Sequence, residues 1–251
     1  EEYEKLMLKA AKLDPVCYYS LGDYFIERHE EDRGAPYIDK ACATDPDSVR
    51  VSDHAVWRVR YCLEKGQTNK ASEIAAQAAE VYSYTGLEAE AIFLEATTNY
   101  DGAFGYYSKI EERYDDSIPL LCFCTRYQVQ TGDQRFAPEI QKRIHKMFPK
   151  GIEKVSLADF HGPPADGVLI QEENRRVRAA GLKAGNVIVA VYGVRVHNFQ
   201  QYTYGRELKK TPELDLIVWQ GDAYREFKPS LTNHLFGVTF GDYPQISPET
   251  R

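Results

Sequence analysis

Hydrophobic residues recur at helical spacing through the first three-fifths of the chain and at strand spacing beyond it. In the early part, Tyr18, Leu21 and Phe25 fall on one stripe of a helix. After Pro149, apolar and polar residues alternate over short runs, which is the pattern of half-buried strands. We therefore predict an all-α helical domain over residues 1–149, with no sheet within residues 15–145, and a small sheet-rich domain with two helices over residues 150–246.

A spacing near 34 residues organises the helical region. Turn signals recur at Lys65-Gly66-Gln67, Asn99-Tyr100-Asp101 and Thr131-Gly132-Asp133, and a small residue opens each following helix, at Ala71, Ala103 and Ala137. Asp45-Pro46 closes the first helix pair and Met147-Phe148-Pro149 closes the last, because proline cannot continue a helix. Segment Glu1–Asp14 is interpreted as the second helix of an earlier pair. About four pairs plus a leading helix are expected, stacked as a right-handed solenoid.

The first pair resembles the tetratricopeptide-repeat (TPR) family. The matching residues are Tyr18-x-x-Leu21-Gly22-x-x-Phe25, followed by Gly34, Ile38, Ala41 and Pro46. Gly22 is expected to let the neighbouring helix approach closely. The resemblance implies a protein-binding concave face with Tyr19, Asp23, Arg60, Glu88, Ile92 and Arg126 among its residues.

One subset of that family binds chaperone tails through a Lys/Asn/Arg clamp for a C-terminal carboxylate. Here Tyr19 and Asp23 stand at the early clamp positions, so this clamp is absent and chaperone-tail binding is not expected. The alternative is that the array only spaces or docks the second domain.

The pattern after Pro149 predicts a specific order of strands and helices. Strands are expected near Glu153–Leu157, Val168–Gln171, Val187–Val191, Leu214–Trp219 and Arg225–Lys228. A short helix is expected near Arg175–Ala180, and a longer one from Phe199 to Lys210, with Asn198 as its N-cap and Thr211-Pro212 at its end.

This order resembles the circularly permuted PDZ domain of bacterial envelope proteins such as the high-temperature-requirement proteases. The matching segments are Gly167-Val168-Leu169-Ile170 and the run from Ala179-Ala180-Gly181-Leu182 to Val191-Tyr192-Gly193. The resemblance covers roughly residues 152–231. It departs from the family at Asn186, where Asp is usual, and at Tyr192, where Asn is usual. Because Tyr tolerates positive φ less well than Asn, we expect that turn to be rebuilt.

The resemblance implies that an extended peptide adds a strand between a sheet edge and the longer helix. On the helix, the candidate contacts are Phe199, Gln200, Thr203, Tyr204 and Glu207. A loop holding the peptide carboxylate would be Leu235-Phe236-Gly237-Val238, which has suitable chemistry but follows the usual end of the domain, or Lys150-Gly151-Ile152. Phe236 and Val238 would otherwise belong to an extra strand that closes the sheet.

Composition and motifs narrow the function class. The net charge is −7 and the excess of acids lies in residues 1–150, which argues against nucleic acid as a partner. No apolar run approaches the roughly 20 residues needed to span a bilayer. No nucleophile elbow, phosphate loop, dinucleotide fingerprint or zinc motif is present, and the six histidines are scattered, so neither enzymatic activity nor a cofactor or metal is expected.

Arg175, Arg176 and Arg178 form a basic patch, interpreted as a solvated helix start rather than an anion site. Five cysteines without a paired pattern favour a reducing compartment, whereas permuted PDZ domains are common in bacterial envelopes, and the envelope is slightly favoured. The sequence leaves the oligomeric state open.

These observations favour a non-enzymatic adaptor or scaffold that binds a protein or peptide, either at a C-terminal or at an internal segment. Two alternatives stay open. The chain would be the substrate-recognition fragment of a larger envelope protease, or an assembly scaffold whose PDZ-like groove is filled by its own residues after Leu231.

Overall fold

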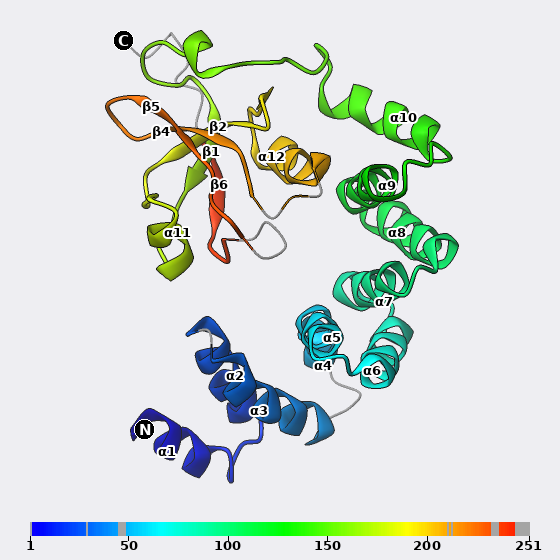
Figure 1. The fold of residues 1–251 in the computed structure, drawn as a ribbon. Helices are drawn as coiled ribbons and strands as arrows, with labels where there is room; N and C mark the ends of the chain where they lie inside the picture. The colour runs from blue at the N-terminus through cyan, green and yellow to red at the C-terminus, as the bar shows by residue number, and fades with distance from the viewer. Residues whose placement is uncertain are drawn as a thin grey trace. The chain divides into compact units, whose positions relative to one another are not determined.

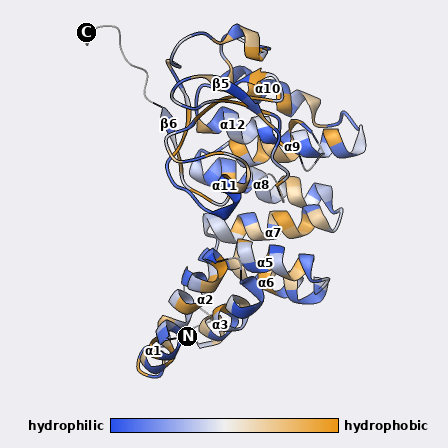
Figure 2. Cartoon of the chain, turned by 60° about the vertical axis from the view of Figure 1, so that its left-hand side comes forward, coloured by the Kyte–Doolittle hydropathy of each residue, from blue (hydrophilic) through white to orange (hydrophobic). Residues whose placement is uncertain are grey.

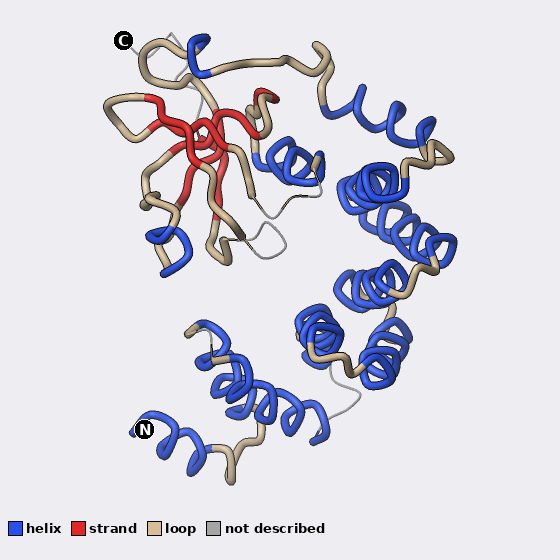
Figure 3. The backbone as a smooth tube through the Cα atoms, viewed as in Figure 1, coloured by secondary structure: helices blue, strands red, loops and turns tan. Residues whose placement is uncertain are grey.

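The computed structural model describes residues 2–28, 30–44, 49–209, 211, 213–231 and 236–243. Its described part is a helical region followed by a small antiparallel sheet (Figures 1 and 3). The chain divides into two compact units, Glu1–Asp116 and Ser117–Arg251, which are described separately. This division lies inside the helical region, whereas the change from helix to strand follows residue 149.

The first unit is entirely helical in its described residues. Its helices are α1 (Glu2–Ala10), α2 (Cys17–Glu27), α3 (Glu31–Thr44), α4 (Val49–Asp53), α5 (Ala55–Glu64), α6 (Thr68–Glu80), α7 (Tyr84–Ala96) and α8 (Tyr100–Tyr114). Helices α2 and α3, α5 and α6, and α7 and α8 pack as consecutive pairs after a leading α1. Figure 2 shows hydrophobic and hydrophilic residues on the same helices, as expected for elements that bury one face.

The turns of the first unit repeat with the helices. Tyr82 and Thr98 adopt positive φ at helix ends, as does Gly66 in the turn after α5, so turns recur about every 16 residues. The side chains of Ser83 and Asn99 then cap α7 and α8 by accepting hydrogen bonds from Gly86 N and Gly102 N.

Small residues let these helices approach closely. A Cβ added to Gly22 would lie 2.4 Å from Ile38 Cδ1, and one added to Gly86 would lie 2.1 Å from the backbone oxygen of Ala78. The prediction that Gly22 meets the neighbouring helix with no room for a side chain is confirmed. Ala71 and Ala103, which open the second helices, are fully buried.

The second unit begins with two more helices, α9 (Ile118–Thr131) and α10 (Ala137–Met147). A 3-10 helix, η1 (Leu157–Asp159), precedes β1 (Gly167–Ile170), α11 (Arg175–Ala179), β2 (Val187–Val191) and β3 (Val194–Arg195). Then follow α12 (Phe199–Gly205), a 3-10 helix η2 (Arg206–Leu208), β4 (Leu216–Trp219), β5 (Tyr224–Phe227) and β6 (Phe240–Tyr243).

The sheet runs in the order β5-β4-β2-β1-β6, with β3 paired to β2, and all its pairings are antiparallel. Val168 and Ile170 of β1 point to one face, where they join Val177 of α11 and Tyr202 of α12 in a buried core. Leu169 points to the other face, which has a smaller apolar cluster. The helices α11 and α12 therefore contribute to the same core.

Most expected elements of the sheet domain are present, with two corrections. Where a strand was expected at Glu153–Leu157, the chain makes a single bridge between Lys154 and Val194 and then turns into η1, so that prediction is wrong. The reason is a capping box, in which Ser156 and Asp159 bond each other's backbone or side chain and bend the segment. The longer helix ends earlier than expected, at Gly205, and continues as η2.

The turn at Tyr192 has the left-handed backbone conformation, which a tyrosine rarely adopts. Tyr192 has φ +49° and Gly193 has φ +71°, so the strands β2 and β3 are joined by two left-handed residues. The Tyr192 hydroxyl donates to the carbonyl of Glu213 at 2.6 Å, and its backbone N–H donates to the carbonyl of Asp215. These two bonds hold Tyr192 in the left-handed region, so the turn is not rebuilt as expected.

Candidate functional site

Strand β6 is an outer strand of the described sheet. It pairs with β1 on one side, and no strand within the described residues pairs with its other side. The N–H of Gln171 donates to the carbonyl of Thr239, so in this antiparallel ladder Gly241 and Tyr243 also face β1. The backbone polar groups of Phe240 and Asp242 therefore point away from the sheet.

The segment immediately before β6 presents two successive N–H groups in one direction. Asn174 Nδ2 donates to the carbonyl oxygens of Phe236 at 2.7 Å and of Gly237 at 3.1 Å. Because a trans peptide places its N–H opposite its C=O, the N–H groups of Gly237 and Val238 point away from Asn174. Successive N–H groups of this kind, with Gly237 at φ +68°, suit an anion.

Asn174 is fixed by a second role. Its side-chain oxygen accepts a hydrogen bond from Val177 N at 2.9 Å, which makes it the N-cap of α11. The Arg176 guanidinium comes within 3.8 Å of the place that a Cβ on Gly237 would occupy. Part of the basic patch of α11 therefore lies beside the Phe236–Val238 segment.

Helix α12 contacts β6 through its first turn. The ring of Phe240 lies 5.8 Å from that of Phe199 and 5.2 Å from that of Tyr202. The backbone N–H of Phe199 donates to Asp242 Oδ1 at 2.7 Å. Asn198 caps the helix by accepting from Gln201 N, as predicted.

The opposite side of α12 packs against α9 and the end of α10. The Cys122 thiol donates to the carbonyl of Thr203 at 3.9 Å, and Glu207 pairs with Arg126 at 3.4 Å. Tyr204 makes an edge contact with Phe148 and is only 3 % exposed, and this burial raises its pKa to about 12.

These contacts place the predicted peptide contacts of the helix on different sides of it. Tyr204 and Glu207 lie on the α9 side, whereas Phe199 and Tyr202 face β6. Thr203 follows Phe199 by one turn, and its hydroxyl donates to the carbonyl of Phe199 at 3.0 Å. The helical spacing of 3.6 residues per turn separates Tyr204 from Tyr202, but the sequence does not show which side of the helix meets the sheet edge. Gln200 is exposed, and Tyr202 was missed because a core residue and an edge residue have the same apolar signature.

The two candidate loops have different outcomes. Leu235 lies outside the described residues. Phe236 is 1 % exposed, Val238 is half-buried against the same core, and the extra strand that closes the sheet starts just beyond them, at Phe240. Lys150-Gly151-Ile152 follows α10 and leads to no strand, so only the later loop precedes a strand edge.

The residues predicted for the concave face of the helical array lie in different environments. Tyr19 is buried, stacks on His54 at 4.7 Å and donates its hydroxyl to Cys42, so it is a core residue rather than a surface contact. Asp23 pairs with His54 at 3.1 Å. Arg60, Glu88 and Ile92 are half-buried, with Ile92 packed against the α5–α6 core, and Arg126 is the partner of Glu207.

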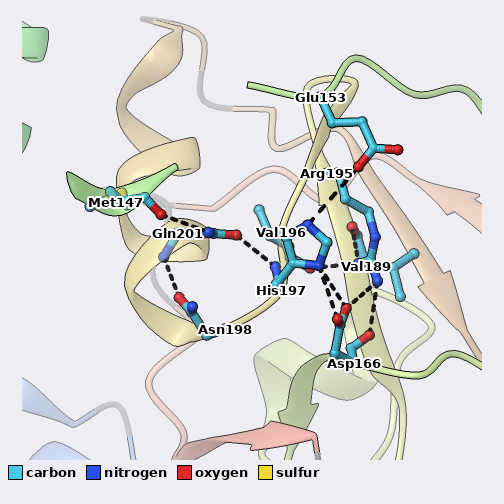
Figure 4. Close-up of polar contacts among 9 residues, drawn as sticks. All are labelled: Met147, Glu153, Asp166, Val189, Arg195, Val196, His197, Asn198 and Gln201. Carbon is cyan, nitrogen blue, oxygen red and sulfur yellow. Dashed lines mark hydrogen bonds and ion pairs between the residues drawn. The ribbon is translucent and has the colours of Figure 1, made fainter. Parts of the chain in front are cut away.

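A polar network that the sequence did not reveal anchors the start of α12 (Figure 4). Asp166 accepts hydrogen bonds from the side chains of Arg195 and His197, the latter at 2.9 Å. Gln201 Oε1 accepts from the N–H of His197 at 2.8 Å, and its amide donates to the carbonyl of Met147 at 2.9 Å. This chain of bonds joins α10, α12 and the loop before β1 into one framework.

The comparisons add no family assignment. No protein-family model matches the chain, and no curated protein matches it. Within the described ranges, no helix is both long enough and apolar enough to cross a bilayer, and no three His, Cys, Asp or Glu side chains are grouped to hold a metal ion.

Proposed function

We propose that this chain is a non-enzymatic adaptor that binds an extended peptide of a partner protein at the outer edge of β6. Three features together support it: an edge of β6 that no described strand pairs with, a preceding segment with two parallel N–H groups, and a flanking helix. An exposed sheet edge suits peptide recognition by strand addition, and aligned backbone N–H groups suit capture of a C-terminal carboxylate. This arrangement also agrees with the resemblance to PDZ domains.

In this proposal the peptide runs antiparallel to β6, and its C-terminal carboxylate accepts from Gly237 N–H and Val238 N–H. The nearby Arg176 guanidinium adds a positive charge at that end. Main-chain bonds to Phe240 and Asp242 supply much of the affinity, and contact with the exposed ring of Phe199 favours apolar side chains on the peptide.

The other outer strand, β5, is a poorer candidate for the same role. Its central residues, Arg225 and Glu226, are exposed and charged, which is how sheet edges are commonly protected from pairing. In the turn before β5, the N–H of Gln220 is used within the turn, where it donates to the carbonyl of Ala223 at 3.0 Å. The difference between the two edges supports binding at β6.

The helical pairs of the first unit supply a second protein-binding surface in this proposal, as their resemblance to TPR arrays implies. Two weak contacts to one partner would reinforce each other through effective concentration. The alternative of an assembly scaffold draws support from one observation, since residues after Leu231 do lie against α12 as β6. The protease-fragment alternative has no support from the described residues.

A library of heptapeptides with free C-termini, screened against the full chain, tests this proposal. We expect apolar-ended binders of roughly micromolar affinity, or about 8 kcal/mol. Amide shifts of ¹⁵N-labelled protein should concentrate at Gly237–Tyr243 and the start of α12, and not at β5. Binders that shift only the helical unit, or an empty screen, would contradict it.

The ligand itself offers a matched control. Successive residues of a strand point their N–H groups in opposite directions, so only alternate peptide N–H groups can bond β6. N-methylation at those positions should remove binding, whereas N-methylation at the positions between them should be tolerated. Equal effects at all positions would argue against strand addition.

A further inference from the structure

The first turn of α12 is tied to β6 by a backbone bond and a ring contact. The N–H of Phe199 donates to Asp242 Oδ1 at 2.7 Å, and the Phe199 and Phe240 rings stack with centroids 5.8 Å apart at 23°. In the proposed binding mode, the peptide would bond to the backbone of Phe240 and Asp242 and contact the ring of Phe199. Both contacts therefore bear on whether a peptide can enter.

Register shows that these contacts lie on the α12 face of the sheet. Asp242 is opposite Val168 and Phe240 is opposite Ile170, and both β1 residues belong to the core that includes Tyr202. Directly opposed residues point to the same face, so Asp242 and Phe240 point toward α12.

An added strand would meet this contact directly. It would lie about 4.8 Å from β6, with every second side chain on the α12 face. Those side chains need space beside Phe240, where the Phe199 ring now lies. The bond from Asp242 meanwhile holds the first turn of the helix within the reach of one side chain from the strand.

We propose that this contact is a clasp, formed by Phe199 and Asp242, that holds the peptide site closed until a peptide replaces it. The inference rests on the proposed function and specifies how that site is regulated. The incoming peptide replaces the Phe199–Phe240 contact with contacts of its own side chains and displaces the backbone N–H of Phe199 from Asp242.

The distribution of contacts along α12 indicates which part moves. Phe199 is 41 % exposed, whereas Tyr202 is 0 % and Tyr204 is 3 % exposed. The later part of the helix is held by α9 through the Cys122–Thr203 bond and by the Arg126–Glu207 ion pair that follows it. Opening is therefore confined to the Phe199 side chain and the backbone next to it, with the rest of α12 as a fixed support.

The clasp predicts that weakening it strengthens binding. When only a fraction of molecules is open, the apparent dissociation constant equals the intrinsic one divided by that fraction. As long as most molecules are closed, removing one hydrogen bond raises the open fraction by roughly three- to tenfold. The Asp242 side chain is on an exposed residue, so its truncation leaves the core intact.

The test compares Asp242→Ala with Asp242→Asn and Asp222→Ala in the full chain. Asn keeps an oxygen that can accept from Phe199 N–H, and Asp222 is an exposed acid in the β4–β5 turn whose removal changes the net charge equally. The probe is the pooled heptapeptide library with free C-termini, and the measurement is the dissociation constant of its retained fraction. Amide exchange at Phe199 without peptide is the second readout.

We expect Asp242→Ala to bind three- to tenfold more tightly and to exchange faster at Phe199, with the other two variants close to wild type. Unchanged or weaker binding by Asp242→Ala, while wild type binds, overturns the clasp and leaves the proposed function in place. Unchanged exchange at Phe199 overturns it as well. A library that no variant retains overturns the proposed function, and the clasp with it.

Discussion

The helix pairs α2–α3 and α9–α10 arise from the same sequence pattern but are held together differently. In α2–α3 the helices meet at glycines, since a Cβ on Gly22 would contact Ile38 and one on Gly34 would lie 2.8 Å from the oxygen of Gly22. In α9–α10 three rings do this work: Phe136 lies 5.6 Å from Phe123 and 5.0 Å from Tyr127. Small residues therefore allow the close contact within α2–α3, whereas aromatic side chains fill the contact within α9–α10.

The two pairs also differ in how much of each helix is buried. Helix α2 has a buried stripe, whereas α9 is buried continuously from Leu120 to Thr125. A helix that is buried all round has neighbours on more than one side. For α9, these include α10, α12 and η2. Sequence periodicity therefore predicts that a helix forms, whereas the elements packed against the helix decide to which unit it belongs.

The largest expected effect comes from cutting the chain at the two competing boundaries. A fragment of residues 117–251 should unfold cooperatively, whereas residues 150–251 should lose about 3 kcal/mol or more, because Tyr204 becomes exposed and Gln201 loses the carbonyl of Met147. Urea unfolding followed by the fluorescence of Trp219 measures this difference. Equal unfolding midpoints would return the boundary to residue 149.

Close helix approach in the first unit is tested by two alanine substitutions. Gly86→Ala should cost about 2–3 kcal/mol, because the new Cβ meets the backbone of Ala78, which cannot move alone. Gly105→Ala is the matched control: it lies inside α8 with open space around it, and should stabilise by about 0.5–1 kcal/mol. With Trp219 replaced by Phe, Trp57 reports the unfolding of this unit alone.

The Gly22 contact should give a similar or smaller loss. Gly22→Leu overpacks α2 against α3 and should cost about 1–3 kcal/mol, with the lower end reached if the flexible end of Ile38 moves aside. Thermal unfolding of this variant, compared with Gly22→Ala, shows how far Ile38 yields. A Leu variant as stable as wild type would mean that the pair is not set by its glycine.

Much of the fold could be predicted from the sequence because local signals were strong. Gly66, Gly132 and the Asn99 cap mark the turns of the helix pairs, and the run Val187–Val191 identified the central strand β2. Periodicity also gave the leading helix and the helix that follows Asn198. In each of these places the residues themselves determine the local conformation.

The rest depended on contacts that sequence order conceals. Arg126 and Glu207 were assigned to two different binding surfaces, yet they pair with each other, because α9 packs on the helix that carries Glu207. The continuous run Leu120–Cys124 was the available signal of that packing. The Asn174–Phe236 bond spans 62 positions and has no signature in the sequence, so the orientation of the loop before β6 could not be predicted.

Electrostatics gives the smallest expected difference between the regions. Burial lowers the pKa of His54, but its hydrogen bonds with the Asp23 carboxylate and the Arg50 carbonyl outweigh burial, so the pKa is raised. In the second unit the cation that pairs with Glu207 is Arg126, and an arginine stays charged between pH 6 and pH 8.

The sign follows from the raised pKa of His54. The stabilisation that His54 contributes is fully present below its pKa in the unfolded chain, about 6.5, and is lost as pH rises through its pKa in the folded protein. The free energy of unfolding of the first unit should therefore fall by about 0.2–1 kcal/mol on going from pH 6 to pH 8. Urea unfolding read from Trp57 checks this, and the slope should vanish in His54→Gln. A slope that persists in that variant would assign the pH dependence to another group.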